Sequence, residues 1–237
     1  MQHELPLTPR ETARADQDGA PSSSADRARS TVVTAVVAVV ALAAGLALGL
    51  LGAGALLRAP VPGDSSVDAG FARDMQAHHA QAVEMSVLVR DRTDDEEVRV
   101  LALDILLTQQ QQQGQMFGWL ATWGLPQAST DPVMAWMADH HDGPLDEGLG
   151  LAAMPGYASA EQLERLTSAQ GQEAERLYLA LMIPHHQGGV DMADVAAEQA
   201  EQPAVRALAA AMVAAQRSEI AVLRQMLDER GGAPDDL

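Results

Sequence analysis

One motif occurs twice in this sequence, and the two copies lie 107 residues apart. Residues 75–79 read Met-Gln-Ala-His-His, and residues 182–186 read Met-Ile-Pro-His-His. The same offset continues without a gap and aligns further identical residues: Val83 with Val190, Met85 with Met192, Val98 with Val205, Arg99 with Arg206, Leu101 with Leu208, Ala102 with Ala209, Gln109 with Gln216, Leu120 with Leu227 and Gly124 with Gly231. A register kept over about fifty residues indicates an internal duplication.

The duplicated unit has the pattern of a helical hairpin: a helix with Met-x-x-His-His, a short turn and a second long helix. Aromatic residues make up only 3% of the chain, and no strand pattern is present, which favours helices. Two such hairpins predict an all-α fold, a four-helix bundle with both His pairs available to its core.

The N-terminal part of the chain has a different composition. Residues 1–30 show no apolar period, which predicts a disordered cytoplasmic tail. Residues 31–57 are uncharged and predict an uncleaved transmembrane helix, because a span needs about 20 apolar residues and a signal peptide has only about 7–15. The alternative is cleavage near Ala53-Gly54-Ala55. Residues 58–67 read as a linker, and residues 68–231 as the duplicated helical-bundle domain.

Charge and cysteine content limit the partners and the cellular location that we expect for this domain. The formal net charge is −18, which disfavours nucleic acid as a partner and favours cations. Cysteine is absent, which excludes disulfides and thiolate ligands. An acidic, cysteine-free domain fits the outside of the cell, so we expect a single-pass cell-membrane protein with its C-terminal domain outside the cytoplasm. A homo-oligomer is compatible with this pattern.

Capping signals divide the domain into helices. Thr93 and Glu96 have the spacing of a capping box, and Ser159 and Gln162 repeat it. Pro184 predicts a kink just before the second His pair. The expected helices cover about residues 68–90, 93–124, 131–142, 159–171, 173–200 and 203–230.

The His pairs fall on the apolar side of their helices. On a helical wheel, Met75, His78, His79 and Met85 lie within an arc of about 160°. A single such pair is more often a packed core residue. Two equivalent pairs would bury four imidazoles, each costing about 1–3 kcal/mol without a partner, and this favours a metal site. The candidate ligands are His78, His79, His185, His186, Met75, Met182, Met85 and Met192, whereas Glu84 and Asp191 lie on the far side.

Imidazole and thioether without thiolate is a ligand set suited to copper, and thioether favours Cu(I). A third His pair lies in the connector, where an accessory metal site and simple packing of a connector helix are both open. Its candidate residues are Met134, Met137, His140 and His141.

Four polar residues lie on the apolar faces of the second helix of each hairpin: Gln109, Gln112, Gln216 and Glu219. Buried polar groups need partners, and the facing histidines are candidates for hydrogen bonds that would orient ligating imidazoles. The alternative is that these side chains reach water at the end of the bundle.

These motifs resemble a bacterial domain-of-unknown-function family, family 305. The resemblance rests on Phe71-x3-Met75-x2-His78-His79-x5-Met85, on Met182-Ile183-x-His185-His186-x5-Met192-Ala193, on Met154-Pro155-Gly156 and on Gln216-x2-Glu219-Ile220. It covers about residues 66–228 and implies a ferritin-like helical bundle. Because the family includes the periplasmic copper-binding CopM proteins, the resemblance also implies extracytoplasmic copper binding by the eight His and Met candidates. The connector departs from the family, whose members often carry more Met and His there.

Three hypotheses follow. The first is a membrane-anchored copper-binding protein for sequestration, tolerance or delivery, in which His79 and His186 share one metal with His78 and His185 beside them. The second is a metal-free interaction domain whose histidines sense pH. The third is a di-metal oxidoreductase, which would need Glu-x-x-His pairs that this sequence lacks. An enzyme is therefore not favoured.

Overall fold

The computed structural model describes residues 36, 38–49, 60–140 and 150–234. The chain divides into two units, residues 1–58 and 59–237. In the first unit, residues 36 and 38–49 are helical. Most of the predicted span 31–57 and the whole of the predicted tail 1–30 lie outside the described residues. Within the described ranges, no helix is both long enough and apolar enough to cross a membrane.

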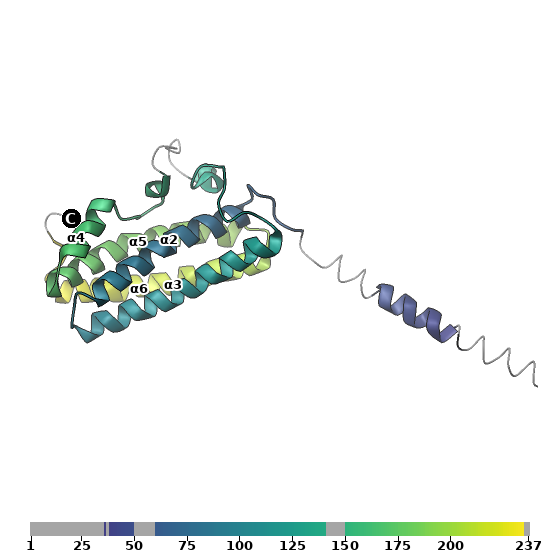
Figure 1. Cartoon of the computed structure of the whole chain (residues 1–237), viewed down its shortest axis with the longest axis horizontal. Helices are drawn as coiled ribbons and strands as arrows, with labels where there is room; N and C mark the ends of the chain where they lie inside the picture. Colours follow the sequence, from purple (N-terminus) through teal and green to yellow (C-terminus); the bar gives the residue numbers. More distant parts are fainter. Residues whose placement is uncertain (1–35, 37, 50–59, 141–149, 235–237) are drawn as a thin grey trace, which may run out of the picture. The chain divides into compact units, whose positions relative to one another are not determined.

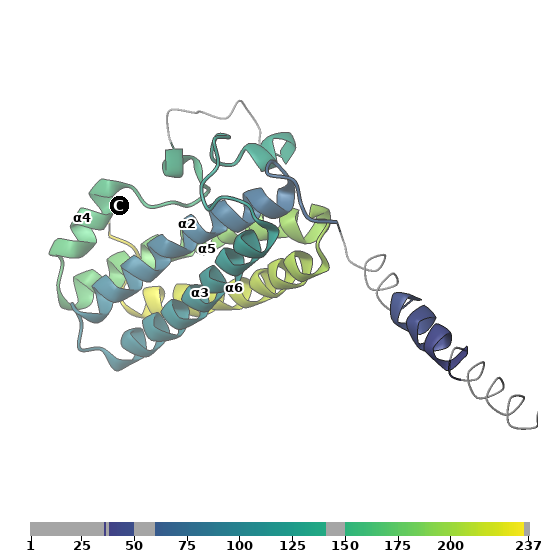
Figure 2. The same ribbon diagram turned by 45° about the vertical axis from the view of Figure 1, so that its right-hand side comes forward.

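The second unit is built from helices, as Figures 1 and 2 show. Four long helices lie side by side, and α2 contacts α3 and α5 while α5 contacts α6. The shorter α4 and η1 contact α2 and α5. The elements are α2 Val67–Arg90, α3 Glu96–Trp123, η1 Ala135–His140, η2 Gly150–Ala153, α4 Ala160–Ser168, α5 Gly171–Gln199 and α6 Pro203–Glu229. The all-helical expectation is confirmed, since residues 60–140 and 150–234 contain no strand.

Most helix ends agree with the capping signals. Gly124 ends α3 in the left-handed region with φ 71°, as expected of a terminal glycine. Ser159 and Gln162 form the predicted capping box of α4. Gly171, expected to break a helix, has φ 56° and begins α5. That helix continues through Pro184 to Gln199.

The predicted capping box at the start of α3 is wrong. The N-cap is Asp95, whose side chain accepts a hydrogen bond from Val98 N at 3.0 Å. Thr93 instead donates its hydroxyl to Glu175 and accepts from Asp95 N. The Thr93 hydroxyl therefore accepts from Asp95 N and not from Glu96 N, and a buried carboxylate of α5 accepts its hydrogen.

The connector is also different from the expected helix over residues 131–142. Only a short 3-10 helix forms, and Met134 before it has φ 67°. The Oδ2 atom of Asp74 accepts from Met134 N and from Trp136 Nε1, each at 2.8 Å. Trp136 packs over Gly70, where an added Cβ would lie 2.5 Å from its ring. Contacts with α2 thus override the local helix signal.

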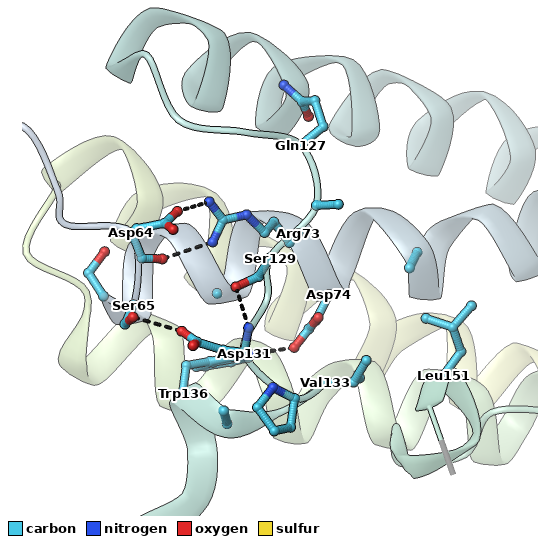
Figure 3. Close-up of a pocket in the computed structure, with 16 residues that line it drawn as sticks. Asp64, Ser65, Arg73, Asp74, Gln127, Ser129, Asp131, Val133, Trp136 and Leu151 are labelled. Atoms are coloured by element: carbon cyan, nitrogen blue, oxygen red, sulfur yellow. Dashed lines mark hydrogen bonds and ion pairs between the residues drawn. The ribbon is translucent and has the colours of Figure 1, made fainter. Parts of the chain in front are cut away.

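A pocket of about 350 Å³ lies beside this connector (Figure 3). Arg73 is one of its lining residues and donates to the side chain and to the carbonyl of Asp64 (Figure 3). Arg73 also donates to the carbonyl of Pro126 at 3.0 Å. Ser65 donates to Asp131 at 2.7 Å on the same side. These contacts join the start of α2 to the segment that follows α3.

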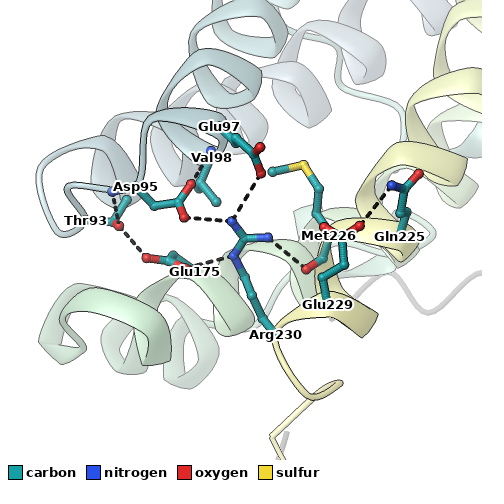
Figure 4. Close-up of polar contacts among 9 residues, drawn as sticks. All are labelled: Thr93, Asp95, Glu97, Val98, Glu175, Gln225, Met226, Glu229 and Arg230. Atoms are coloured by element: carbon teal, nitrogen blue, oxygen red, sulfur yellow. Dashed lines mark hydrogen bonds and ion pairs between the residues drawn. The ribbon is translucent and has the colours of Figure 1, made fainter.

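At the other end of the unit, Arg230 joins three helices (Figure 4). Its guanidinium donates to Glu175 Oε2 and to Asp95 Oδ2, each at 2.8 Å. Glu175 is buried, with 6% of its surface exposed, and also accepts from Thr93. The start of α5 and the end of α6 are thereby held to the start of α3.

The buried apolar residues form two clusters along the long helices. One contains Met75, Met116 and Met192, and the other contains Met85 and Met182. Between these stretches of α2, α3, α5 and α6 lie buried polar residues, which we call the polar layer: His78, His79, Gln109, Gln112, His185, His186 and Gln216, with the half-buried Glu219 beside them. The polar layer therefore interrupts an otherwise apolar core.

Candidate metal centre

The polar layer brings the two His pairs together. His78 and His79 lie midway along α2, His185 and His186 lie midway along α5, and each exposes 1% or less of its surface. The rings of His78 and His185 stack with centroids 3.7 Å apart and an angle of 27°. The predicted convergence of the two pairs is therefore found in the structure.

Each imidazole uses its Nε2 atom for one hydrogen bond. The partner of His78 is the Pro155 carbonyl at 3.1 Å, and that of His185 is the His78 carbonyl at 3.1 Å. His79 contacts Gln112 Oε1 at 2.8 Å, and His186 contacts Glu219 Oε2 at 2.7 Å. All four partners are acceptor oxygens, so each Nε2 carries the hydrogen and each Nδ1 keeps its lone pair.

The four Nδ1 atoms have no hydrogen-bond partner among the described residues, although all are buried. Burial lowers the pKa of His78 to about 4 and that of His79 to about 3. Burial, reinforced by the neighbouring imidazoles, also lowers the pKa of His185 well below its usual value. These rings are therefore neutral at pH 7, the state in which imidazole binds a metal.

A loop packs against the polar layer and supplies the Pro155 carbonyl. Gly156 has φ 69°, and an added Cβ there would lie 2.0 Å from the Pro184 carbonyl oxygen. At Gly188 an added Cβ would lie 1.9 Å from the Pro155 carbonyl oxygen. Gln81 anchors the same loop by accepting from Ala158 N and donating to Ala158 O. The two glycines permit a backbone approach that any side chain would block.

The model of the family described as Domain of unknown function (DUF305) matches residues 68–227. The chain belongs to this family. The family predicted from the motifs is thus confirmed. No curated protein sequence matches the chain.

Several solved structures resemble the chain along nearly their whole length. A DUF305 protein of Streptomyces coelicolor, described as a presumed secreted protein, is 46% identical with a TM-score of 0.66, over 74% of this chain and 100% of that one. A DUF305 fragment from Deinococcus radiodurans is 33% identical with a TM-score of 0.58, over 72% and 99%. CopM in its Cu(I)-bound form is 25% identical with a TM-score of 0.51, over 70% and 98%.

In this DUF305 domain, the eight candidate ligands are all buried. The methionines are divided between the two apolar clusters: Met75 lies with Met192, and Met182 lies with Met85. The two equivalent methionines Met75 and Met182 therefore belong to different sides of the polar layer. Among the described residues, no three His, Asp or Glu side chains stand in a ready metal-ligand arrangement.

Of the four polar residues expected to contact the histidines, two do so. Gln112 contacts His79 and Glu219 contacts His186, at equivalent positions of the duplication. Gln109 and Gln216 are buried, but the Oε1 atoms of both lack a partner within the described part of the chain. An added Cβ at Gly189 would lie 2.4 Å from Gln216 Oε1, so that glycine leaves room for the amide.

The proposed accessory site is not assembled by the described residues. Met134 and Met137 are buried in the apolar cluster that contains Met75. The side chain of His140 and the whole of His141 lie outside what the structure describes. Met134 precedes the 3-10 helix in a left-handed conformation, so Met134 and Met137 do not lie on one continuous α-helix.

Sequence reasoning missed three contributors to the polar layer: the Pro155 carbonyl, the His78 carbonyl and Gln81. A signal for the first was available in the Met-Pro-Gly motif and in Gly188-Gly189, because adjacent glycines permit another backbone to approach closely. Glu84 and Asp191 are exposed, as their helical positions predicted.

Proposed function

We propose that this DUF305 protein binds copper outside the cytoplasm, for sequestration, tolerance or delivery. The observation that supports it is the set of four buried Nδ1 atoms without partners. An unpaired buried acceptor destabilises the folded state by about 1–3 kcal/mol. The polar layer contains four such acceptors, one on each histidine. A bound metal ion would give these lone pairs the partner that the protein does not.

The residues that would hold the ion are His78, His79, His185 and His186 through Nδ1. Met75, Met192, Met85 and Met182 are buried one to two turns away on the same helices and would add thioether sulfur. Neutral imidazole with thioether suits a soft ion, which favours Cu(I) over harder divalent ions. CopM, solved with Cu(I) bound, supports this choice.

The hydrogen bonds at Nε2 would orient the four rings for this task. Each is made to an acceptor that cannot donate in return, so each fixes the same tautomer. A pH-sensing role is less well supported, because the pKa values of His78 and His79 lie below the range in which such switches work.

We also propose that the four long helices form a ferritin-like bundle and that residues 31–57 anchor it to the membrane. The packing of α2 with α3 and α5, and of α5 with α6, supports the bundle. The uncharged run supports the anchor. The description of the Streptomyces relative as presumed secreted supports an extracytoplasmic location.

Titration of the purified chain with Ag(I), a stable analogue of Cu(I), tests the central proposal. We expect one tight site per chain in the wild type, because the two His pairs form one layer. The His79→Gln and His186→Gln variants should each weaken that site, and the double variant should lose little more than either single one. Absence of tight binding in the wild type would contradict copper binding.

A further inference from the structure

The two hairpins differ in charge at one pair of equivalent positions. Gln112 on α3 contacts His79 Nε2 at 2.8 Å, and Glu219 on α6, 107 residues later, contacts His186 Nε2 at 2.7 Å. The two contacts have the same geometry, but only the second brings a negative charge. The duplication therefore has one carboxylate where a symmetric site would have none or two.

Glu219 is the one carboxylate that contacts a histidine of the polar layer among the described residues. Its side chain is 21% exposed, whereas that of His186 is fully buried. Three other acidic side chains on α2 and α5 have different surroundings. Glu175 forms an ion pair with Arg230, and Glu84 and Asp191 are exposed to solvent. The polar layer thus contains a single carboxylate, and its other members are imidazole and amide groups.

The charge of a bound ion can be compared with the single negative charge of Glu219. A monovalent ion bound by neutral imidazoles and thioethers would be balanced by Glu219, whereas a divalent ion would leave one positive charge uncompensated. Burying a net charge is expensive, and the cost rises steeply with its size. We propose that Glu219 and Gln112 together match the polar layer to a monovalent soft ion: Glu219 supplies the one negative charge that balances such an ion, and Gln112 adds no second charge, which would favour a divalent ion.

This inference rests on the proposed copper binding but assigns separate tasks to two residues. Glu219 is a positioning and charge-compensating residue, since it acts on the ion through His186. Its carboxylate is a stronger acceptor for the hydrogen on His186 Nε2 than a neutral amide would be. Gln112 keeps the equivalent ring, His79, in the same tautomer without that charge.

Three variants of the full chain separate charge from structure, because Glu and Gln have nearly the same shape. Glu219→Gln removes the charge, Gln112→Glu adds a second one, and the double exchange moves the single charge to the other hairpin. The binding of Ag(I) and of Zn(II) is measured for each by competition. Far-UV circular dichroism and the thermal midpoint of the apo protein show whether each variant is folded.

The expected affinities follow the number of carboxylates. Glu219→Gln should weaken Ag(I) binding by about 10- to 100-fold and Zn(II) binding by more. Gln112→Glu should raise Zn(II) affinity relative to Ag(I) by about tenfold or more. The double exchange should restore the wild-type ratio of the two affinities, which a merely structural role of either residue would not do.

The outcomes distinguish this inference from the function on which it rests. A wild type that binds neither ion overturns copper binding. A wild type that binds Ag(I), with the same Ag(I)-to-Zn(II) ratio in every folded variant, overturns only the charge-matching inference. If Gln112→Glu does not fold, an unchanged ratio in Glu219→Gln overturns it alone, and a raised ratio supports it.

Discussion

The first and second hairpins have the same His motif, but their histidines use different partners. In the second hairpin, His185 bonds the backbone carbonyl of His78 in the first. His78 does not return this bond to its counterpart but bonds the Pro155 carbonyl of the connecting loop. A segment outside the duplication has therefore entered the polar layer and made its two halves unequal.

The residues that receive this loop are themselves equivalent. Gln81 and Gly188 are 107 positions apart, and both contact the loop. Gln81 binds Ala158 through both ends of its amide, whereas Gly188 offers only space for the Pro155 carbonyl. The duplication accounts for the four equivalent histidines. The difference between Gln81 and Gly188 accounts for the different contacts that each half makes with the loop.

The far ends of the hairpins differ in the same way. The first hairpin ends at Trp123 and Gly124, with Trp123 stacked on Trp119 at 6.1 Å. The position equivalent to Trp123 in the second hairpin is Arg230, which reaches back to Glu175 and Asp95. An aromatic end is therefore replaced by a charged clamp between hairpins.

Removing the clamp should have the largest effect on stability. In Arg230→Met, the buried Glu175 carboxylate loses its charged partner, and we expect a loss of about 3–5 kcal/mol in the free energy of unfolding. Urea unfolding measures it. The control is Arg224→Met on the exposed side of α6, which should change stability by less than about 0.5 kcal/mol. Equal losses in both variants would show that the clamp does not hold the hairpins together.

Filling the space at Gly188 should have a smaller effect. The Cβ of Gly188→Ala would lie 1.9 Å from the Pro155 oxygen, a backbone atom that moves only with its loop. We expect a loss of about 1–3 kcal/mol and a weakened His78–Pro155 bond. The control, Gly114→Ala, meets no atom within 4 Å and should gain up to about 1 kcal/mol in its helix. If the two variants unfold at the same urea concentration, the close packing of the loop is not maintained in solution.

The smallest expected effect, counted for one histidine over one pH unit, is the pH dependence of the apo protein's free energy of unfolding. Folded His78 and His79 stay neutral down to pKa values of about 4 and 3, whereas an unfolded histidine binds a proton below about pH 6.5. The unfolded state thus binds more protons below pH 6.5. Stability is complete above that pH and falls on acidification, by up to about 1.4 kcal/mol per pH unit for each histidine.

The thermal midpoint measured from pH 7 to pH 5 tests this dependence. His79→Gln removes one of the titrating rings, so its midpoint should fall less steeply than that of the wild type. Identical slopes would mean that His79 is not buried as a neutral ring.

Much of the fold followed from sequence because its signals are local or repeated. The offset of 107 residues predicted two equivalent hairpins, and the apolar arc predicted that the histidines face the core. The contacts of Gln112 and Glu219 could also be foreseen, since both lie on the apolar face of their helices. The periodicity of an α-helix is sufficient to place such residues.

What the sequence did not predict depends on contacts between distant segments. Asp95 rather than Thr93 caps α3, and the Thr93 hydroxyl donates instead to Glu175, 82 residues away. The connector does not become a full α-helix because Asp74 captures Met134 N and Trp136 Nε1. The Met-Pro-Gly motif and Gly188-Gly189 indicated a close backbone approach, but residue types alone did not identify the Pro155 carbonyl as the partner of His78.

The most direct test of the account is a long-range ¹H–¹⁵N spectrum of the histidines of the full chain, before and after one equivalent of Ag(I). We expect all four polar-layer rings to be Nε2–H tautomers in the apo protein. We also expect Ag(I) to shift Nδ1 resonances of both hairpins together and to leave the Nε2 hydrogens in place. Apo rings with the hydrogen on Nδ1, or Ag(I) shifts confined to one hairpin or to Nε2, would contradict a single site formed by the duplicated His pairs.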